Sequence, residues 1–343
     1  MNVERVGVTC GGNWILDRVK LIDCLPDRGM LANIRAETVS TGGSPANVLD
    51  DLSRLGAPFP LSGFGLVGDD EGGRLVQRTF DRPGIDISGI RTTEASTSYT
   101  DVMTEEHTGT RSFFHHRGAN ALFGPKHVAV ETLTCKIFHL GYLLLLDRMD
   151  EPDDEYGTIA ARFLHELQSA GIKTSVDIVS ENSGRFRTIV PPALQYLDYL
   201  IVNEIEASRT VGREARTRNG ELDAEALTKS VDELLELGRM DLVAVHMPEG
   251  CYVKDRSGIS CSCGSLQLPD AFIKGTVGAG DAFCAGMLYG IHQGWSYEEM
   301  VELGNCCAAA SLSMPGATDG VGRLSEVLEM RDEFSNNEPP VKI

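Results

Sequence analysis

Short, continuous apolar runs alternate with amphipathic stretches along this 343-residue chain, and this alternation constrains its fold more than any other feature. Continuous apolar strands are typical of a parallel sheet that helices cover on both faces. The pattern therefore predicts an α/β three-layer sandwich with a mainly parallel central sheet. The expected strands are Val6–Cys10, Pro60–Val67, Lys136–Leu140, Thr174–Val179, Asp198–Asn203, Asp241–His246 and Cys251–Asp255, and the expected helices are Ser44–Leu55, Glu71–Phe80, Tyr156–Ala170, Glu204–Val211, Ala224–Leu237, Gly278–His292 and Tyr297–Ser313.

Two segments interrupt this alternation because they are richer in Thr, Ser and Arg. They cover approximately residues 18–40 and 95–117, and the second contains a hairpin pattern over Ser98–Phe114. Both read as solvent-facing strands, so we expect a small β-strand lid. Residues 1–334 would then form one domain with the lid inserted, and residues 335–343 a frayed tail. Exposed lid edges favour pairing with a second copy, which makes a homodimer a hypothesis.

The composition excludes several classes of function. The formal net charge of −19 argues against a nucleic-acid partner, which would need clustered Lys and Arg. The longest apolar runs, such as Leu140–Leu146, are too short to span a bilayer, and the chain does not open with a signal-peptide pattern. Nine irregularly spaced cysteines favour reduced thiols. We therefore expect a cytoplasmic protein without a membrane partner.

The segment Gly275–Phe283, with the sequence Gly-Thr-Val-Gly-Ala-Gly-Asp-Ala-Phe, carries the strongest chemical signal. Gly278 and Gly280 allow a tight turn before an apolar helix, and the N–H groups at that helix start point at an anion. Asp281 is an unusual residue for a site that only binds phosphate. It would serve if its carboxylate accepts a hydroxyl proton while the N–H groups stabilise a moving phosphoryl group. The segment therefore predicts a kinase that acts on a small alcohol.

A second glycine pair, Gly42-Gly43, precedes a predicted helix. Ser44 is an expected N-cap and Pro45 suits the first helical turn, so one interpretation is a simple helix start. On the functional interpretation, the glycines admit a ligand close to the backbone, and Asn47 offers hydroxyls both a donor and an acceptor. These residues alone leave both interpretations open.

Together, the two glycine sites resemble the two signatures of the ribokinase/PfkB family of carbohydrate kinases. The second site matches the family pattern Asp-Thr-x-Gly-Ala-Gly-Asp-Ala-Phe except at its first position, and Asn203-Glu204-Ile205-Glu206 fits the family's Asn-x-x-Glu. Further segments that look familial follow in the family's order. They are Gly42, Gly43, Ala46, Asn47, Leu55 and Gly56 of the first signature, then Gly63–Asp70, Arg117–Ala121 and Asn305–Ala317.

The resemblance implies a ribokinase-like fold and an ATP-dependent transfer to a hydroxyl, expected to be primary, of a sugar or related polyol. Asp281 would be the general base, and the N–H groups of Gly278, Ala279 and Gly280 would form the anion hole. Asn203 and Glu206 would help to place Mg²⁺ through water molecules. The implied nucleotide contacts are Asn203, Thr276, Asn305 and Gly316.

The implied substrate site follows the first strand, where the family places a substrate-binding aspartate and this chain has Asp17. A carboxylate can accept two vicinal hydroxyls at once, which suits a polyol. Trp14 would either stack on the substrate or fill the edge of the core. The implied substrate ligands are Asp17, Asn13, Gly42, Gly43 and Asn47.

Three departures from the family pattern limit what the resemblance implies. Gly275 replaces the usual aspartate near the monovalent-cation site, so potassium activation is in doubt. The segment Val245–Gly250 keeps only the last glycine of the family's Thr-x-Gly-x-x-Gly nucleotide loop, which leaves the preferred phosphate donor open. Gly141-Tyr142 follows a strand after which ribokinases carry glutamate, so ribose specificity is unsupported.

Two alternative functions stay open. The spacing Gly12-Asn13-x-x-x-Asp17 resembles members that bind a nucleoside ribose, and Trp14 could stack on a base, which would make the protein a nucleoside kinase. The altered residues at 275 and 245–250 are compatible with a catalytically silent ligand-binding relative, which the retained Asp281 opposes.

Some charged residues have simpler structural interpretations. The acidic segment Asp150–Glu155 reads as a solvated loop. Arg111 and Arg117 could pair with an anionic substrate such as a sugar phosphate, although ordinary surface arginines are commoner. Asp177 would be an orienting residue at the cleft or a helix cap.

Overall fold

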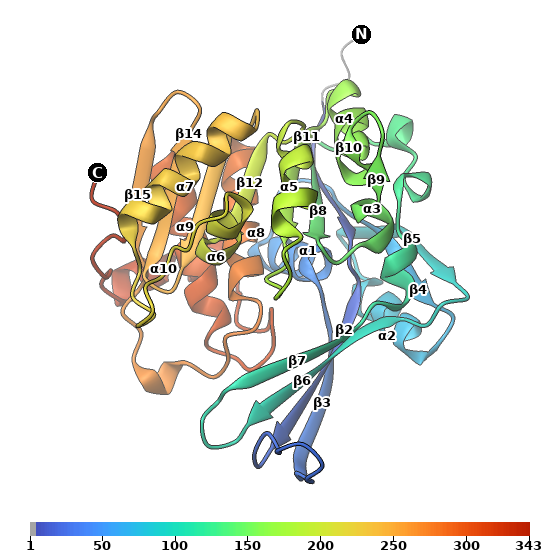
Figure 1. Ribbon diagram of the computed structural model, residues 1–343, viewed down its shortest axis with the longest axis vertical. Helices are drawn as coiled ribbons and strands as arrows, with labels where there is room; N and C mark the ends of the chain where they lie inside the picture. Colours follow the sequence, from blue (N-terminus) through green and yellow to red (C-terminus); the bar gives the residue numbers. More distant parts are fainter. Residues whose placement is uncertain (1–4) are drawn as a thin grey trace.

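The computed structural model describes residues 5–343 and has the predicted three layers, a central sheet between two sets of helices (Figure 1). The strand order is β15-β14-β13-β12-β11-β8-β1-β4-β5. All pairs from β13 to β5 are parallel, and the β13–β14 and β14–β15 pairs are antiparallel. The bounds are β1 Val8–Gly12, β4 Leu61–Gly68, β5 Ile85–Thr93, β8 Ile137–Leu143, β11 Lys173–Ile178, β12 Tyr199–Asn203, β13 Leu242–Met247, β14 Gly250–Asp255 and β15 Ser260–Gly264.

Two apolar cores hold the helices against the two faces of this sheet. One core contains buried side chains of α1, α2, α8, α9 and α10, and the other those of α3, α4, α5, α6 and α7. Alternate residues of one strand enter different cores, as Leu242 and Val243 of β13 do, because successive side chains point to opposite faces. The helices are α1 Ser44–Leu55, α2 Glu71–Phe80, α3 Asp147–Asp150, α4 Ile159–Ser169, α5 Phe186–Leu194, α6 Glu204–Thr210, α7 Ala224–Leu237, α8 Ala279–Gln293, α9 Tyr297–Ser311 and α10 Leu324–Glu333.

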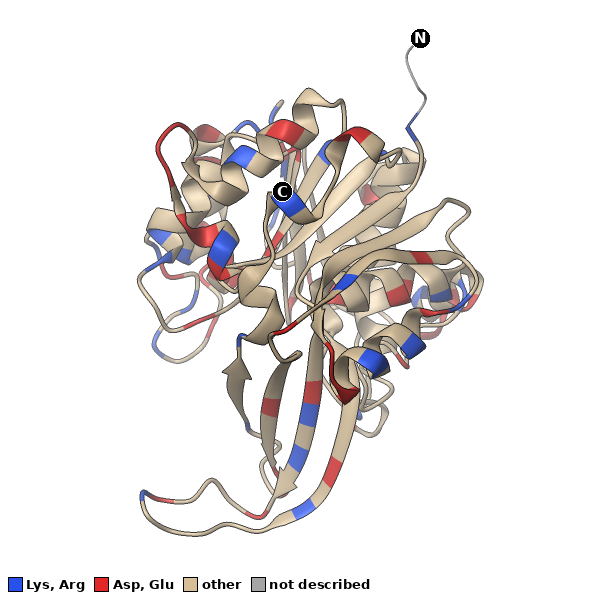
Figure 2. Ribbon diagram, turned by 90° about the vertical axis from the view of Figure 1, so that its right-hand side faces the viewer, with Lys and Arg blue, Asp and Glu red and all other residues tan. Residues whose placement is uncertain are grey.

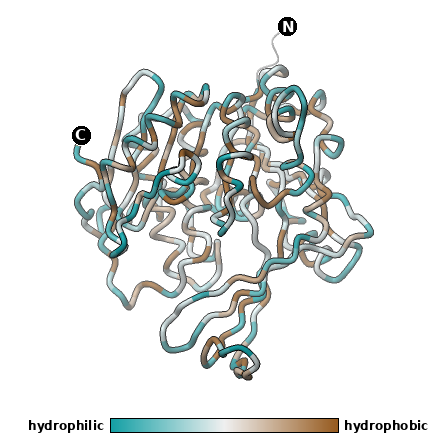
Figure 3. Tube along the Cα trace, viewed as in Figure 1, coloured by the Kyte–Doolittle hydropathy of each residue, from teal (hydrophilic) through white to brown (hydrophobic). Residues whose placement is uncertain are grey.

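Hydropathy along the backbone follows this layering (Figure 3). Apolar residues gather in the sheet and on the sides of the helices that face the sheet. The prediction from periodicity gave the bounds of α1, α2 and α7 as the structure has them. It began α4 too early, because residues 157–158 pair as β10 Gly157–Thr158 with β9 Pro152–Asp153 and the Thr158 hydroxyl caps the helix. It also missed β5, β15, α5 and α10.

The lid is a separate four-stranded sheet in the order β3-β2-β6-β7, which confirms the prediction. It projects from the body beside the carboxyl end of β1, and Lys, Arg, Asp and Glu are spread along its strands (Figures 1 and 2). β2 and β6 run parallel, and the outer pairs are antiparallel. The lid strands are β2 Ile15–Ile22, β3 Ile34–Gly42, β6 Ser98–Glu105 and β7 Arg111–His116.

The acidic segment from residue 150 is not simply a solvated loop, because Asp150 is buried. Its carboxylate accepts hydrogen bonds from the Leu144 N–H at 3.1 Å and from Arg185 at 3.2 Å. Burial raises the pKa of Asp150 to about 6, and these hydrogen bonds and the charge of Arg185 oppose the rise. The prediction was therefore wrong for this residue, which anchors the chain that follows β8.

Residues 335–343 pack against the body rather than fray. The Gln267 N–H donates to Ser335 at 2.8 Å, the Asn337 N–H donates to Ser265 at 2.8 Å, and Val341 is buried. The division into a domain at 1–334 and a tail remains a prediction, and its residues 1–4 lie outside the described part. No helix within residues 5–343 combines the length and apolar character needed to cross a membrane.

Candidate active site

The start of α8 is a glycine turn enclosed on two sides. Gly278 caps the helix with φ 80°, in the left-handed region that favours glycine. A Cβ there would lie 2.4 Å from the Ala317 carbonyl oxygen, and a Cβ on Gly280 would lie 2.8 Å from the His246 ring. The first N–H groups of the helix have no helical acceptor. These N–H groups are therefore free to act as the predicted nest of donors, which stays a prediction.

Asp281 lies in the first turn of α8 and is buried. Its Oδ2 accepts a hydrogen bond from Asn47 Nδ2 at 2.7 Å, and the Tyr142 hydroxyl lies 3.2 Å from Oδ1 and 3.4 Å from Oδ2. Burial raises the pKa of Asp281, and the hydrogen bonds from Asn47 and Tyr142 oppose that rise. The structure thus joins the two glycine signatures through their predicted functional residues.

The Gly42-Gly43 segment brings Asp17 of the lid to the same place. A Cβ on Gly42 would lie 2.0 Å from Asp17 Oδ2, and one on Gly43 would lie 2.2 Å from the Asn13 carbonyl oxygen. Burial, and then the charge of Asp281, raise the pKa of Asp17 to about 7. Asp17, Asn47 and Asp281 therefore surround one site, with glycines where no side chain fits.

The helix start at residue 44 differs from the prediction. Gly43, with φ 93°, is the N-cap of α1, and no side chain caps the helix. Ser44 is the first helical residue and is buried, and its hydroxyl lies 3.0 Å from His139 Nε2. The N-cap prediction for Ser44 was wrong because this side chain bonds to the neighbouring strand β8.

Asn13 occupies a supporting position rather than facing the site. It is fully buried, its Oδ1 accepts from the Tyr142 N–H at 2.5 Å, and its Nδ2 donates to the Leu145 carbonyl at 3.4 Å. Both ends of the amide therefore hold the chain after β8. The Asn13 carbonyl lies against Gly43, but the Asn13 side chain is engaged with the backbone of residues 142 and 145.

Trp14 belongs to the core. It is fully buried, its Nε1 donates to the Phe64 carbonyl at 2.9 Å, and its ring meets Phe80 edge-on at 5.1 Å. Gly63 and Gly65 lie against the indole, where a Cβ would approach the ring within 2.8 and 2.0 Å. The proposed stacking of Trp14 on a substrate is therefore wrong.

The Asn203 and Glu206 pair forms a capping box at the start of α6. Asn203 Oδ1 accepts from the Glu206 N–H at 2.8 Å, Glu206 Oε2 accepts from the Asn203 N–H at 3.0 Å, and Glu206 Oε1 accepts from the Ser180 hydroxyl at 2.8 Å. Burial raises the pKa of Glu206 to about 7. The pKa of Asp177 is also raised strongly. Burial is the largest cause, and the charges of Glu206 and Asp281 add to it. These buried carboxylates make a region that a cation would stabilise.

The predicted nucleotide residues have different surroundings. Thr276 is exposed just before the glycine turn. Gly316 lies beside the Asp319 carboxylate, which a Cβ would meet at 2.3 Å. Asn305 is buried and its Nδ2 donates to the Gly264 carbonyl at 3.0 Å, so it ties α9 to the end of β15. A Cβ on Gly275 would lie 3.0 Å from the carbonyl oxygens of both Met314 and Pro315.

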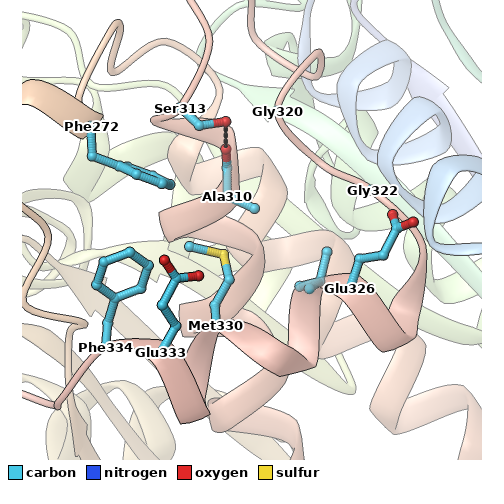
Figure 4. Close-up of a pocket in the computed structure, with 10 residues that line it drawn as sticks. Phe272, Ala310, Ser313, Gly320, Gly322, Glu326, Met330, Glu333 and Phe334 are labelled. Atoms are coloured by element: carbon cyan, nitrogen blue, oxygen red, sulfur yellow. Dashed lines mark hydrogen bonds between the residues drawn. The ribbon is translucent and has the colours of Figure 1, made fainter.

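A cavity of about 230 Å³ lies between α9, α10 and the turn at residues 270–272 (Figure 4). Phe272, Met330 and Phe334 form its apolar walls, and Ala310 and Ser313 lie on its α9 side. None of Asp17, Asn47 and Asp281 lines this cavity. It is therefore distinct from the site around the carboxylates, although it lies beside α9, which carries the predicted nucleotide contact Asn305.

Tyr142 is the site residue that sequence reasoning missed. Its position directly after the apolar strand β8 was a usable signal, because polar side chains at the carboxyl ends of parallel strands line the ligand crevice of open α/β sheets. The departure from the family pattern at 141–142 indicates by itself only the loss of a glutamate. The structure shows that a phenol reaches Asp281 from this position.

Comparison with known proteins identifies the family of the chain. The model of the pfkB family carbohydrate kinases matches residues 12–322. The chain belongs to the PfkB family of carbohydrate kinases. It is accordingly a kinase with an ATP-binding, ribokinase-like structure, as the sequence predicted.

Relatives within the PfkB family act on different acceptors. The chain is 27% identical over 306 residues to an ATP-dependent ribose-1-phosphate kinase of Halopiger xanaduensis, covering 89% of this chain and 90% of the relative. It is 29% identical over 289 residues to a fructokinase of Escherichia coli, covering 80% and 87%. These similarities support sugar kinase activity without distinguishing the sugar.

Solved structures share the fold. The ribokinase of Arabidopsis thaliana complexed with ribose and ATP superimposes with a TM-score of 0.77 at 20% identity, covering 95% of this chain and 98% of that one. A putative ribokinase II from E. coli in complex with ATP and Mg²⁺ superimposes with a TM-score of 0.75 at 18% identity, covering 95% of this chain and 99% of that one.

Proposed function

We propose that this PfkB kinase transfers the γ-phosphoryl group of ATP to a primary hydroxyl of a sugar or related polyol, with Asp281 as the general base. The observation that carries the proposal is the 2.7 Å hydrogen bond between Asn47 and Asp281. It brings a hydroxyl-binding amide and a carboxylate together beside the glycine nest that starts α8. A phosphoryl transfer needs these elements at one point.

In the proposed reaction the acceptor oxygen forms a bond to phosphorus while the bond from phosphorus to the ADP oxygen breaks. The acceptor proton moves to the Asp281 carboxylate. The N–H groups of Gly278, Ala279 and Gly280 stabilise the charge on the transferred group. Little covalent chemistry is asked of the protein, so positioning supplies much of the rate.

The acceptor would be oriented by Asp17 and Asn47, with Gly42 and Gly43 allowing close approach. Support comes from the raised pKa of Asp17, because a half-buried carboxylate beside Asp281 is stabilised when sugar hydroxyls donate to it. Closure of the lid that carries Asp17 would exclude water, which otherwise competes as an acceptor.

Carboxylate oxygens suit Mg²⁺, so Asp177 and Glu206 fit the ion that this chemistry uses. Both Glu206 oxygens already accept hydrogen bonds, and Asn203 Oδ1 accepts from two backbone N–H groups. Within residues 5–343, no group of three or more His, Cys, Asp or Glu side chains is arranged to hold a metal. The fit is therefore to Mg²⁺ held through water and nucleotide phosphates, with Asn203 and Glu206 as the placing pair. Bound Mg²⁺ would neutralise phosphate charge.

The nucleoside kinase alternative loses one of its supports, because Trp14 is buried in the core and cannot stack on a base. The catalytically silent alternative is opposed by the ordered surroundings of Asp281. Arg117 is engaged with the Leu144 carbonyl at 3.0 Å and with Asp147 at 3.0 Å, so it gives little support for an anionic acceptor.

A panel of sugars, sugar phosphates and nucleosides, each tested with ATP and Mg²⁺ in a coupled ADP assay, would test the proposal. We expect ADP release that depends on a sugar or polyol. Turnover with nucleosides alone would favour the nucleoside kinase. Binding of sugars without any turnover would favour the silent relative.

A further inference from the structure

Tyr142 is a buried hydrogen-bond donor that the mechanism above does not use. We infer that Tyr142 is a positioning residue that orients the Asp281 carboxylate and keeps it ionised for proton transfer. This inference rests on the proposed function, since it concerns the same base.

The geometry divides the two oxygens of Asp281 between two donors. Asn47 Nδ2 holds Oδ2 at 2.7 Å, whereas the Tyr142 hydroxyl lies nearer to Oδ1, at 3.2 Å. The two donors come from α1 and from the end of β8, so they approach the carboxylate from different elements. Together they fix its rotation. Oδ1, which Asn47 leaves free, is the oxygen that would take the acceptor proton.

The main chain around Tyr142 is held by several hydrogen bonds. Its N–H donates to Asn13 Oδ1 at 2.5 Å. Two residues later, Leu144 has φ 72°, the only positive φ of a non-glycine residue in the described part of the chain. The Leu144 carbonyl accepts from Arg117 at 3.0 Å and from Arg185 at 2.6 Å. A backbone held this strongly in an unfavourable region indicates that the direction of the segment matters.

The electrostatic surroundings show why a neutral donor is needed. Besides Tyr142, the ionisable groups whose pKa the charge of Asp281 raises are all acidic. They are Asp17 of β2, Asp51 of α1, Asp177 of β11 and the Cys284 thiol of α8. The His246 ring of β13 packs against Gly280, and burial lowers the pKa of His246 to about 4, so it stays neutral. Burial favours the protonated form of Asp281, which cannot act as a base, and none of these neighbours supplies a positive charge that would oppose the effect.

A phenol that keeps its proton stabilises the ionised form of Asp281 without adding charge. Burial and the neighbouring Asp281 raise the pKa of Tyr142 well above its usual value, so the hydroxyl donates and does not compete as a base. In the transfer the acceptor proton passes to Asp281, and the Tyr142 proton stays on its oxygen. Removing this donor should raise the pKa of Asp281, so that less of the enzyme carries the ionised base at a given pH.

The test is Tyr142→Phe, assayed with the best acceptor of the substrate panel. We expect kcat to fall by about 10- to 100-fold, as for loss of a hydrogen bond to a charged group. The KM for the acceptor should change little, and the acidic limb of the kcat–pH profile should move to higher pH. Tyr289→Phe is the matched control, because Tyr289 is buried on α8 but packs against Phe59 and Trp295. The control should behave as the wild type.

Combining Tyr142→Phe with Asp281→Asn separates the two claims. If Tyr142 acts through Asp281, the substitution Tyr142→Phe causes no further loss of kcat when Asp281→Asn is already present. Normal turnover of Asp281→Asn alone would overturn the proposed function. A wild-type kcat and acidic limb in Tyr142→Phe, with Asp281→Asn inactive, would overturn only the present inference.

An infrared titration of the Asp281 carboxylic acid band, assigned by its loss in Asp281→Asn, gives a readout without turnover. We expect protonation at higher pH in Tyr142→Phe than in the wild type. An unchanged titration would overturn the inference.

Discussion

The side-chain amide of Asn47 donates a 2.7 Å hydrogen bond to the carboxylate of Asp281, although 234 positions separate them in the chain. α1 and α8 lie side by side against the same face of the sheet, so the two glycine-rich helix starts meet. One contact therefore links the proposed ligand of the acceptor hydroxyl, Asn47, to the proposed general base, Asp281.

Asp281→Asn should lower kcat by about 10²- to 10⁴-fold, because the amide cannot accept the acceptor proton. Sugar binding measured by calorimetry should persist, since Asn47 and Asp17 remain. Asp232→Asn is the control, because Asp232 is an exposed residue of α7 that pairs with Lys254 of β14, away from Asp281. Near-normal turnover by Asp281→Asn would contradict the mechanism.

Asn47→Ala should lower kcat/KM by about 10- to 100-fold, because it removes both a hydroxyl ligand and a charge-assisted hydrogen bond. Steady-state kinetics would show a rise in the acceptor KM together with a fall in kcat. A change in the ATP KM alone would instead place Asn47 on the nucleotide side.

Monovalent cations should have little effect on turnover, since Gly275 offers no carboxylate at the position where the family usually has one. Initial rates in potassium chloride and in tetramethylammonium chloride at equal ionic strength would check this. Saturable activation by potassium would show that the carbonyl oxygens of Met314 and Pro315 suffice for a cation site.

Asp17→Asn should stabilise the protein more at pH 8 than at pH 4. The folded pKa of Asp17 is about 7, above its usual value of 3.8. Its contribution to stability is therefore full below about pH 4 and is lost as the pH rises through 7. Thermal unfolding at both values should show a Tm gain of a few degrees only at the higher pH. Equal gains in Tm at pH 4 and pH 8 would contradict the raised pKa of Asp17.

The lid should mediate a homodimer, because Ile34, Val39, Phe113 and Phe114 are exposed on its outer strands β3 and β7. Light scattering should give twice the chain mass for the wild type and the chain mass for the double variant Phe113→Asp, Phe114→Asp. Leu237→Asp, at an exposed apolar position on α7, is the control and should keep the wild-type mass. A wild-type monomer would refute the hypothesis.

Local patterns in the sequence predicted the layers and the lid. The family resemblance implied a common site for Asp17, Gly42, Asn47 and Asp281, which the structure places close together. Other features depend on tertiary contacts that no local pattern contains. The Asn13 side chain points inward because its amide hydrogen-bonds to the backbone at Tyr142 and Leu145. Trp14 is buried because Gly63 and Gly65 leave room for its ring. α5 was missed because Pro191 and Pro192 near its end resemble a helix break. β15 was missed because its sequence is Ser-Cys-Ser-Cys-Gly.

The closing residues of the chain also affect how copies can meet. Backbone hydrogen bonds tie Ser335 and Asn337 to residues 265–267, and the Val341 N–H donates to the Ser262 hydroxyl of the edge strand β15. The end of the chain thus shields this border of the nine-stranded sheet from a neighbouring molecule. Among residues 5–343, no segment covers the outer strands of the lid in this way. The protein therefore has one border blocked against self-association and another left available for it.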